Sequence, residues 1–142
     1  MGAPSVGSEP PFRELEHTAD RAFVVRAPTL PELFVRAAQG LFSLGAAVGG
    51  AAPSITRTLE VSGADLETML VNWLNELLYL QEAHGETYTR FEIHGLYAQG
   101  LRATIYGAPC AGARRVIKAV TFHGLKVERS ADGWEAVFVV DV

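Results

Sequence analysis

Two segments of the chain carry apolar residues at helical spacing. In residues 30–42 and again in residues 66–78, apolar side chains recur at every third or fourth position, which places them on one face of a helix. Thr29 and Asp65 stand directly before these segments, and both have side chains that cap helix N-termini. Gly45 follows the first segment and is a typical stop signal. The pattern therefore predicts two amphipathic helices.

The polar side of the second predicted helix carries Asn72, Asn75, Glu76 and Tyr79 at the same spacing. A polar stripe of this kind is typical of a face that water covers. A surface for a partner is the less common alternative.

The other apolar segments have the composition and the alternation of β-strands. They cover residues 12–16, 21–27, 55–61, 88–98, 101–106, 116–128 and 134–142. Turn signals at Gln99-Gly100 and Asp132-Gly133 predict two hairpins, and residues 107–115 have the composition of a loop. Helices fall between strands in the first half, and strands dominate the second. We therefore expect an α+β fold, a two-layer sandwich in which two main helices pack on a largely antiparallel sheet.

Composition bounds the domain organisation. The chain has 142 residues, of which 49% are hydrophobic and 20% charged, and this profile is typical of one folded globular domain. We expect a disordered tail over residues 1–10 and a single domain over residues 11–142. The tail has neither the basic start nor the hydrophobic stretch of a secretory signal. The sequence also holds no run of 18 apolar residues that would span a membrane, so we expect a cytoplasmic protein.

The charge balance argues against a protein that grips RNA on its own. The 12 Lys and Arg residues are outnumbered by 16 Asp and Glu residues, which gives a net charge of -4, whereas nucleic-acid-binding domains are usually basic. A protein partner or a cation suits this chain better. The single cysteine, Cys110, excludes an internal disulfide and a metal cage of thiolates.

The end of the last predicted strand is acidic. Asp141 closes that strand, and Val142 follows with an α-carboxylate. Neighbouring anions repel unless a cation neutralises them, and oxygen ligands suit Ca²⁺, Mg²⁺ or Mn²⁺. Asp20, at a break between two predicted strands, is a candidate third ligand. Solvated carboxylates are the simpler interpretation of these residues alone, because chain ends and Asp residues at breaks are common without a metal.

Two further residues are candidates for chemistry. His17 is either a ligand or a base or, as is more common for a lone His beside a strand, a structural hydrogen-bonding group. Lys118 lies on an apolar row of a predicted strand, where its ammonium group either reaches water or is aimed at an anion such as a phosphate. The sequence contains no complete catalytic constellation, so we do not expect an enzyme.

Segments along nearly the whole chain after the tail resemble the archease family. They are FRELEHTAD, TLPELFVRAAQGLFSLG, DLETMLVNWLNELLYL, VIKAVTFHGLKV and the final WEAVFVVDV. The order of these segments and the length of the chain match that family.

This resemblance implies an activating cofactor of a GTP-dependent tRNA-splicing RNA ligase, which joins RNA ends bearing a 2′,3′-cyclic phosphate or a 3′-phosphate to 5′-hydroxyl ends. It implies that Asp20, Asp141 and the carboxylate or carbonyl of Val142 hold a divalent cation, with Ca²⁺ the first expectation and Mg²⁺ or Mn²⁺ the alternatives. Lys118 matches a lysine that the family needs for activation, and His17 stands in the family's H-T-A-D motif. RNA would be met only through the ligase.

Other readings of the chain stay open beside this one. A chaperone-like protein-interaction module would need no metal. A metal-dependent phosphoesterase would use Asp20 and Asp141, but the sequence shows no evident base or phosphate clamp for it. The chain also departs from the family at Arg21, where a small or apolar residue is more common, and in residues 107–115, which lack an Arg-His pair. That segment bears on how the chain would fit the ligase.

Overall fold

The computed structural model describes residues 12–15, 21–44, 52–110 and 117–141. In chain order the elements are β1 Phe12–Leu15, β2 Arg21–Ala27, α1 Leu30–Leu44, β3 Ile55–Ser62, α2 Leu66–His84, β4 Glu86–Leu96, β5 Gly100–Pro109, β6 Ala119–Ser130 and β7 Gly133–Asp141. Both helices and most of the strands lie where the apolar pattern predicts them. The predicted tail, residues 1–10, lies outside the described residues.

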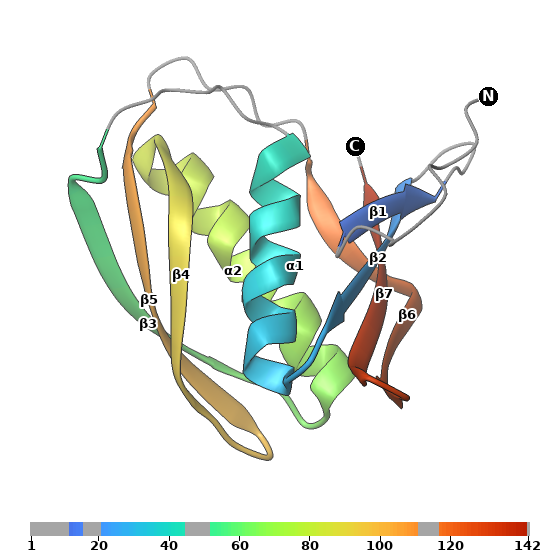
Figure 1. Cartoon of the computed structure of the whole chain (residues 1–142). Helices are drawn as coiled ribbons and strands as arrows, with labels where there is room; N and C mark the ends of the chain where they lie inside the picture. Colours follow the sequence, from blue (N-terminus) through green and yellow to red (C-terminus); the bar gives the residue numbers. More distant parts are fainter. Residues whose placement is uncertain (1–11, 16–20, 45–51, 111–116, 142) are drawn as a thin grey trace.

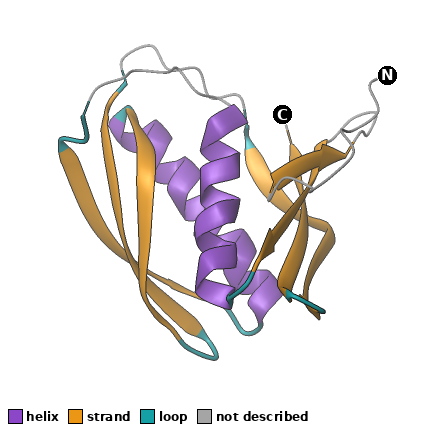
Figure 2. Cartoon of the chain, in the orientation of Figure 1, coloured by secondary structure: helices purple, strands orange, loops and turns teal. Residues whose placement is uncertain are grey.

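The strands form two antiparallel sheets. The first has the order β1-β2-β7-β6 and the second the order β3-β5-β4. Figures 1 and 2 show the two helices between these sheets. The expected α+β class with antiparallel strands is confirmed, and the structure adds that the strands form two sheets rather than one. Alternation predicts which face a side chain takes, but it does not predict which strand lies next to which.

Aromatic side chains join the helices to both sheets. Trp73 of α2 is fully buried, and its indole N–H donates to the carbonyl of Phe34 in α1 at 3.0 Å. Its ring meets Phe91 of β4 edge-on, with centroids 6.4 Å apart. In the other sheet, Phe23 of β2 packs on Phe138 of β7 at 5.8 Å. Burial of such large side chains is the main stabilising contribution to a domain of this size.

The predicted helix caps are present. Asp65 accepts a hydrogen bond from the N–H of Thr68 at 2.8 Å, which satisfies a donor at the start of α2. Thr29 plays the same part for α1, since its hydroxyl oxygen accepts from the N–H of Glu32 at 3.3 Å. At its other end α2 stops at Gly85, whose φ of 64° places it in the left-handed region.

The predicted loop over residues 107–115 is wrong in its first part, because β5 continues to Pro109. Gly107 pairs with Ile55 on one side and with Tyr88 on the other. A Cβ atom at Gly107 would lie 2.0 Å from the carbonyl oxygen of Thr87. This glycine therefore permits a close approach of two strands and is not a turn signal. Residues 111–116 lie outside the described residues.

The β6–β7 hairpin changes register in the middle. Lys126 faces Val137, but Thr121 faces Val139, so the four residues 122–125 of β6 stand opposite the single residue Phe138. Within this interruption Gly124 has a φ of 68°, and the side chain of Phe122 is 60% exposed. The predicted hairpin is confirmed, but its two halves are separate ladders.

Candidate metal and partner site

The ends of three neighbouring strands lie side by side at one end of the four-stranded sheet, and together they form its strand-end edge. Asp141 is the last residue of β7, and its Cα partner on β6 is Ala119. The N–H of Lys118 donates to the carbonyl of Asp141 at 2.8 Å. On the other side of β7, Arg21 at the start of β2 faces Val140. The backbone therefore fixes Lys118, Asp141 and Arg21 beside one another.

The side chains at this edge are polar and exposed, while those behind them are buried. Asp141, Lys118 and Arg21 are exposed, whereas Val140 and Val120 are 0% and 3% exposed. Lys118 thus keeps its charge at the surface, as the snorkelling interpretation requires. A carboxylate held at the end of an ordered strand and reached by solvent can take a cation without disturbing the core.

Only part of the expected ligand set falls inside the described residues. Of the three expected ligands, Asp20 and Val142 lie outside them, and Asp141 is described. His17, expected at the partner contact, also lies outside the described residues. Within the described ranges, no group of three or more His, Cys, Asp or Glu residues could hold a metal ion. The chemistry of the expected set still fits a hard divalent cation, because all its donors are oxygen atoms. In the chain, Asp20 directly precedes Arg21 and Val142 directly follows Asp141.

The polar side of α2 has a role that its pattern did not predict. The side-chain amide of Asn75 accepts from the N–H of Val120 at 2.8 Å and donates to the carbonyl of Val120 at 3.0 Å. Asn72 donates to the carbonyl of Ser62 at 2.7 Å. These two amides bind α2 to β6 of one sheet and to β3 of the other. The polar stripe of α2 therefore joins the helix to both sheets and is not only a solvated face.

An ion pair between a buried carboxylate and a half-buried guanidinium in the three-stranded sheet was not among the candidates. Glu86 is 6% exposed, and its two carboxylate oxygens each accept from the guanidinium of Arg57 at 2.7 Å. The hydroxyl of Tyr88 donates to the same carboxylate, also at 2.7 Å. The hydrogen bond from Arg57 lowers the pKa of Glu86, and burial together with the Glu86 contact raises the pKa of Tyr88. No local signal could reveal this pair, because its partners are 29 residues apart.

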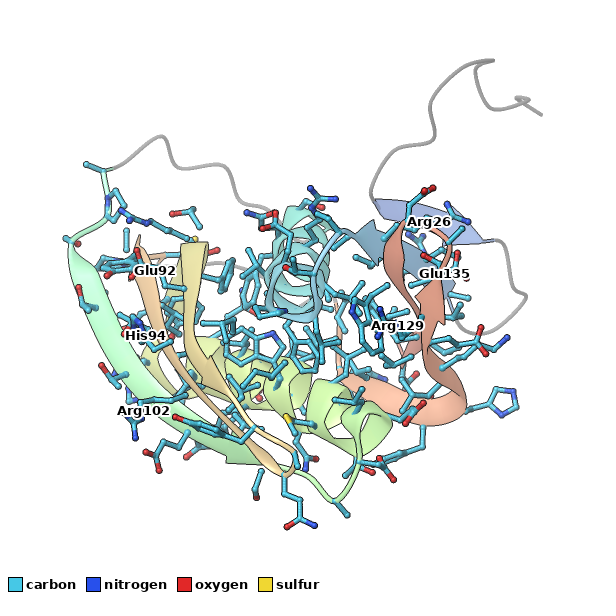
Figure 3. All side chains as sticks on the ribbon, turned by 60° about the horizontal axis from the view of Figure 1, so that its bottom comes forward. Arg26, Glu92, His94, Arg102, Arg129 and Glu135 are labelled. Carbon is cyan, nitrogen blue, oxygen red and sulfur yellow. The ribbon has the colours of Figure 1, made fainter. Side chains whose placement is uncertain are left out.

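A second polar group lies on the outer side of the same sheet (Figure 3). The hydroxyl of Tyr106 donates to Glu92 at 2.9 Å, and the guanidinium of Arg90 lies 4.9 Å from the centre of the Tyr106 ring. The Tyr106 contact lowers the pKa of Glu92, and the same contact raises the pKa of Tyr106. His94 contacts Thr104 at 2.6 Å. These groups satisfy one another across neighbouring strands.

Among the described helices, neither has the length and apolar character that crossing a membrane requires. Fold and site thus define a class: small α+β proteins with two helices between antiparallel sheets and an exposed acidic strand end. The model of the Archease protein family matches residues 12–142. This chain belongs to the archease family.

Curated relatives agree with this assignment. The chain is 37% identical over 139 residues to protein archease of Methanopyrus kandleri, with 93% of this chain and 99% of that protein covered. It is 34% identical over 139 residues to protein archease of Pyrococcus furiosus, with 92% and 98% covered. Both alignments span nearly the whole of both chains.

Solved structures show the same fold. The solution structure of protein 1598 from Methanobacterium thermoautotrophicum superposes with a TM-score of 0.73 at 23% identity, covering 93% of this chain and 99% of that one. The crystal structure of a Thermotoga maritima archease, described as a possible chaperone, superposes with a TM-score of 0.59 at 20% identity, covering 98% and 100%. At these identities the likeness concerns the fold.

Proposed function

We propose that this protein is an activating cofactor of a GTP-dependent tRNA-splicing RNA ligase, and that it works in the cytoplasm. The ligase would join RNA ends bearing a 2′,3′-cyclic phosphate or a 3′-phosphate to 5′-hydroxyl ends. The protein would promote guanylylation of the ligase and its repeated turnover without being an enzyme itself. Membership of the archease family and a net charge of -4 support a role exerted through a protein partner, with RNA met only through the ligase.

The observation that carries the proposal is the exposed carboxylate of Asp141 at the end of β7, beside Lys118. Asp20 and Val142, each one residue away from a described member of that edge, would complete an oxygen ligand set with Asp141. Ca²⁺ would fit it, and so would Mg²⁺ or Mn²⁺. Bound there, the cation would supply positive charge near the phosphates of GTP.

Lys118 and His17 would contact the ligase beside the metal site. The backbone hydrogen bond to Asp141 holds Lys118 at the same edge, so its ammonium group would face an anion that approaches Asp141, such as a phosphate or an acidic side chain of the ligase. His17 precedes Asp20 by three residues in the chain and would assist the same partner contact.

Single-turnover guanylylation of the cognate ligase tests the proposal. We expect the wild-type protein to accelerate the reaction in GTP and Mn²⁺ and the Asp141→Ala variant to lose most of that acceleration. Asp132→Ala is the matched control, because Asp132 is an exposed aspartate in the turn at the opposite end of β7. It should activate like the wild type. Full-speed guanylylation with Asp141→Ala would refute the role of this edge.

A chaperone-like interaction module is the second candidate. The exposed aromatic side chains of Tyr79, Tyr97 and Phe122, each 58–60% accessible, favour it. Suppression of aggregation of unrelated unfolded proteins, equal in the wild type and in Asp141→Ala and without effect on guanylylation, would support this candidate over ligase activation.

A further inference from the structure

Strand β3 forms an open edge of the three-stranded sheet. It pairs with β5 in unbroken register from Ile55 to Ser62. The N–H of Gly63 donates to the carbonyl of Gln99 at 3.2 Å, directly beyond the last paired residues. Because backbone groups alternate in direction along an antiparallel strand, those of Thr58, Glu60 and Ser62 point away from β5. The carbonyl of Ser62 accordingly accepts its hydrogen bond from outside the sheet, from Asn72.

The other edges among the described strands carry features that hinder pairing. Strand β1 has four residues, and β4 has two shifts of register. Strand β6 is interrupted at residues 122–125, and the amide of Asn75 occupies both backbone groups of Val120, as a neighbouring strand would. Short strands, bulges and covered backbone groups protect edges from further pairing. Strand β3 has eight regular residues, and its described cover is the single contact from Asn72 to the carbonyl of its last residue, Ser62. The outward backbone groups of Thr58 and Glu60 lie in the regular part of this edge.

A groove runs beside this edge. Its volume is about 480 Å³, and it is lined by residues 60–62 of β3 and by Asn72, Asn75, Glu76 and Tyr79 of α2. A second hollow of about 380 Å³ borders the same end of β3 and includes Tyr97. An added strand would lie about 4.8 Å from β3. Tyr79 in the groove lining and Tyr97 in the second hollow are both exposed. Figure 1 places β3 on the opposite side of the helices from the C-terminus.

Charge selects the occupant. The groove lining holds the carboxylates of Glu60 and Glu76 and no cation. Arg102 approaches Glu60 at 3.4 Å from β5, but both side chains are more than half exposed, so the pair neutralises little. A second copy of this chain would bring the same carboxylates into the contact. We propose that the β3 edge and the α2 groove bind an extended, basic segment of a partner protein by strand addition.

Three peptide probes separate the contribution of backbone pairing from that of charge. The first is a blocked nonapeptide in which lysine alternates with valine. The second has glutamate in place of lysine, and the third keeps the lysines but carries an N-methyl group on every residue, which removes the backbone donors of both edges. We expect only the first to bind, by fluorescence anisotropy, and to slow hydrogen exchange at the amides of Thr58 and Glu60.

Variants locate the binding to β3. Thr58→Pro removes an outward-pointing N–H while the ladder to β5 stays intact, and it should weaken binding at least tenfold. Glu60→Lys combined with Glu76→Lys should do so even if the proline variant folds poorly. Phe122→Ala, on the protected edge, should bind like the wild type. Equal binding of the N-methylated peptide, equal binding of the acidic peptide, or dimers that protect the β3 amides without any peptide would each overturn the proposal.

Discussion

Two carboxylates of this protein sit in opposite environments. Glu86, in the three-stranded sheet, is buried, and its oxygens accept from Arg57 and Tyr88. Asp141, in the four-stranded sheet, is exposed at a strand end, and its described contact at that point runs through the backbone carbonyl to Lys118. A buried carboxylate must be fully paired for the fold to tolerate it, whereas an exposed one keeps its oxygens available. The first is suited to stability and the second to binding.

Replacing Glu86 should have the largest effect on stability. Glu86→Ala leaves the buried hydroxyl of Tyr88 and the guanidinium of Arg57 without their acceptor. We expect a loss of about 2–3 kcal/mol in the free energy of unfolding, measured by urea denaturation. Glu128→Ala, which removes an exposed carboxylate 4.0 Å from Lys126, is the control and should leave the midpoint in place. An equal shift of the urea midpoint in both variants would contradict the view that a buried carboxylate contributes more to stability than an exposed one.

Acid should weaken the same pair. The Arg57 hydrogen bond lowers the pKa of Glu86 below its ordinary value of 4.5. A carboxyl group with a lower pKa in the folded state stabilises the fold above the unfolded pKa, and that contribution is lost as the pH falls through the folded pKa. The melting temperature should therefore decrease as the pH is lowered below about 4.5. It should drop less steeply in Glu86→Gln, and parallel curves for the two proteins would argue against this assignment.

Removing the Tyr88 hydroxyl should have a smaller effect. Tyr88→Phe deletes one donor to Glu86 but leaves both contacts from Arg57 and the buried ring. We expect a loss of about 1 kcal/mol, again from urea denaturation. A loss as large as that of Glu86→Ala would mean that the hydroxyl, and not the guanidinium, is the main partner of the carboxylate.

Asp141→Ala should have the smallest effect on stability. The backbone hydrogen bond from Lys118 to the Asp141 carbonyl does not need the side chain, and exposed substitutions usually change stability by less than about 0.5 kcal/mol. Calorimetry in a chelating buffer should show an unchanged melting temperature. A marked decrease there would show that this carboxylate, like Glu86, serves the fold.

The sequence predicted what local chemistry determines. The caps Thr29 and Asp65 were found because a capping side chain contacts its own helix, three residues ahead. The pair of Arg57 and Glu86 was not found, because only the order β3-β5-β4 brings the two residues together. The loop predicted over residues 107–115 is wrong in its first part, because a glycine that permits close strand contact, such as Gly107, has the same sequence signal as one in a loop.

The sequence proposes residues for the candidate site but does not predict how the backbone arranges them. A regular hairpin grown from the turn at Asp132-Gly133 would place Phe122 opposite Asp141. The interruption of β6 instead brings Ala119 there, and with it the backbone of Lys118. Nothing in the alternation of apolar residues indicates a shift of this size. The ligand role of Asp141 and the partner role of Lys118 stay predictions, as do the roles of Asp20, Val142 and His17, which lie outside the described residues.

The same interruption affects how this hairpin can change over evolutionary time. Residues 122–125 separate two ladders of the hairpin. A residue gained or lost at the Asp132-Gly133 turn can therefore change the length of this interruption and leave the pairing of Ala119 with Asp141 in register. The backbone contact between Lys118 and Asp141 then does not depend on the length of the turn. Lineages could remodel one end of the hairpin freely while the other end keeps its geometry.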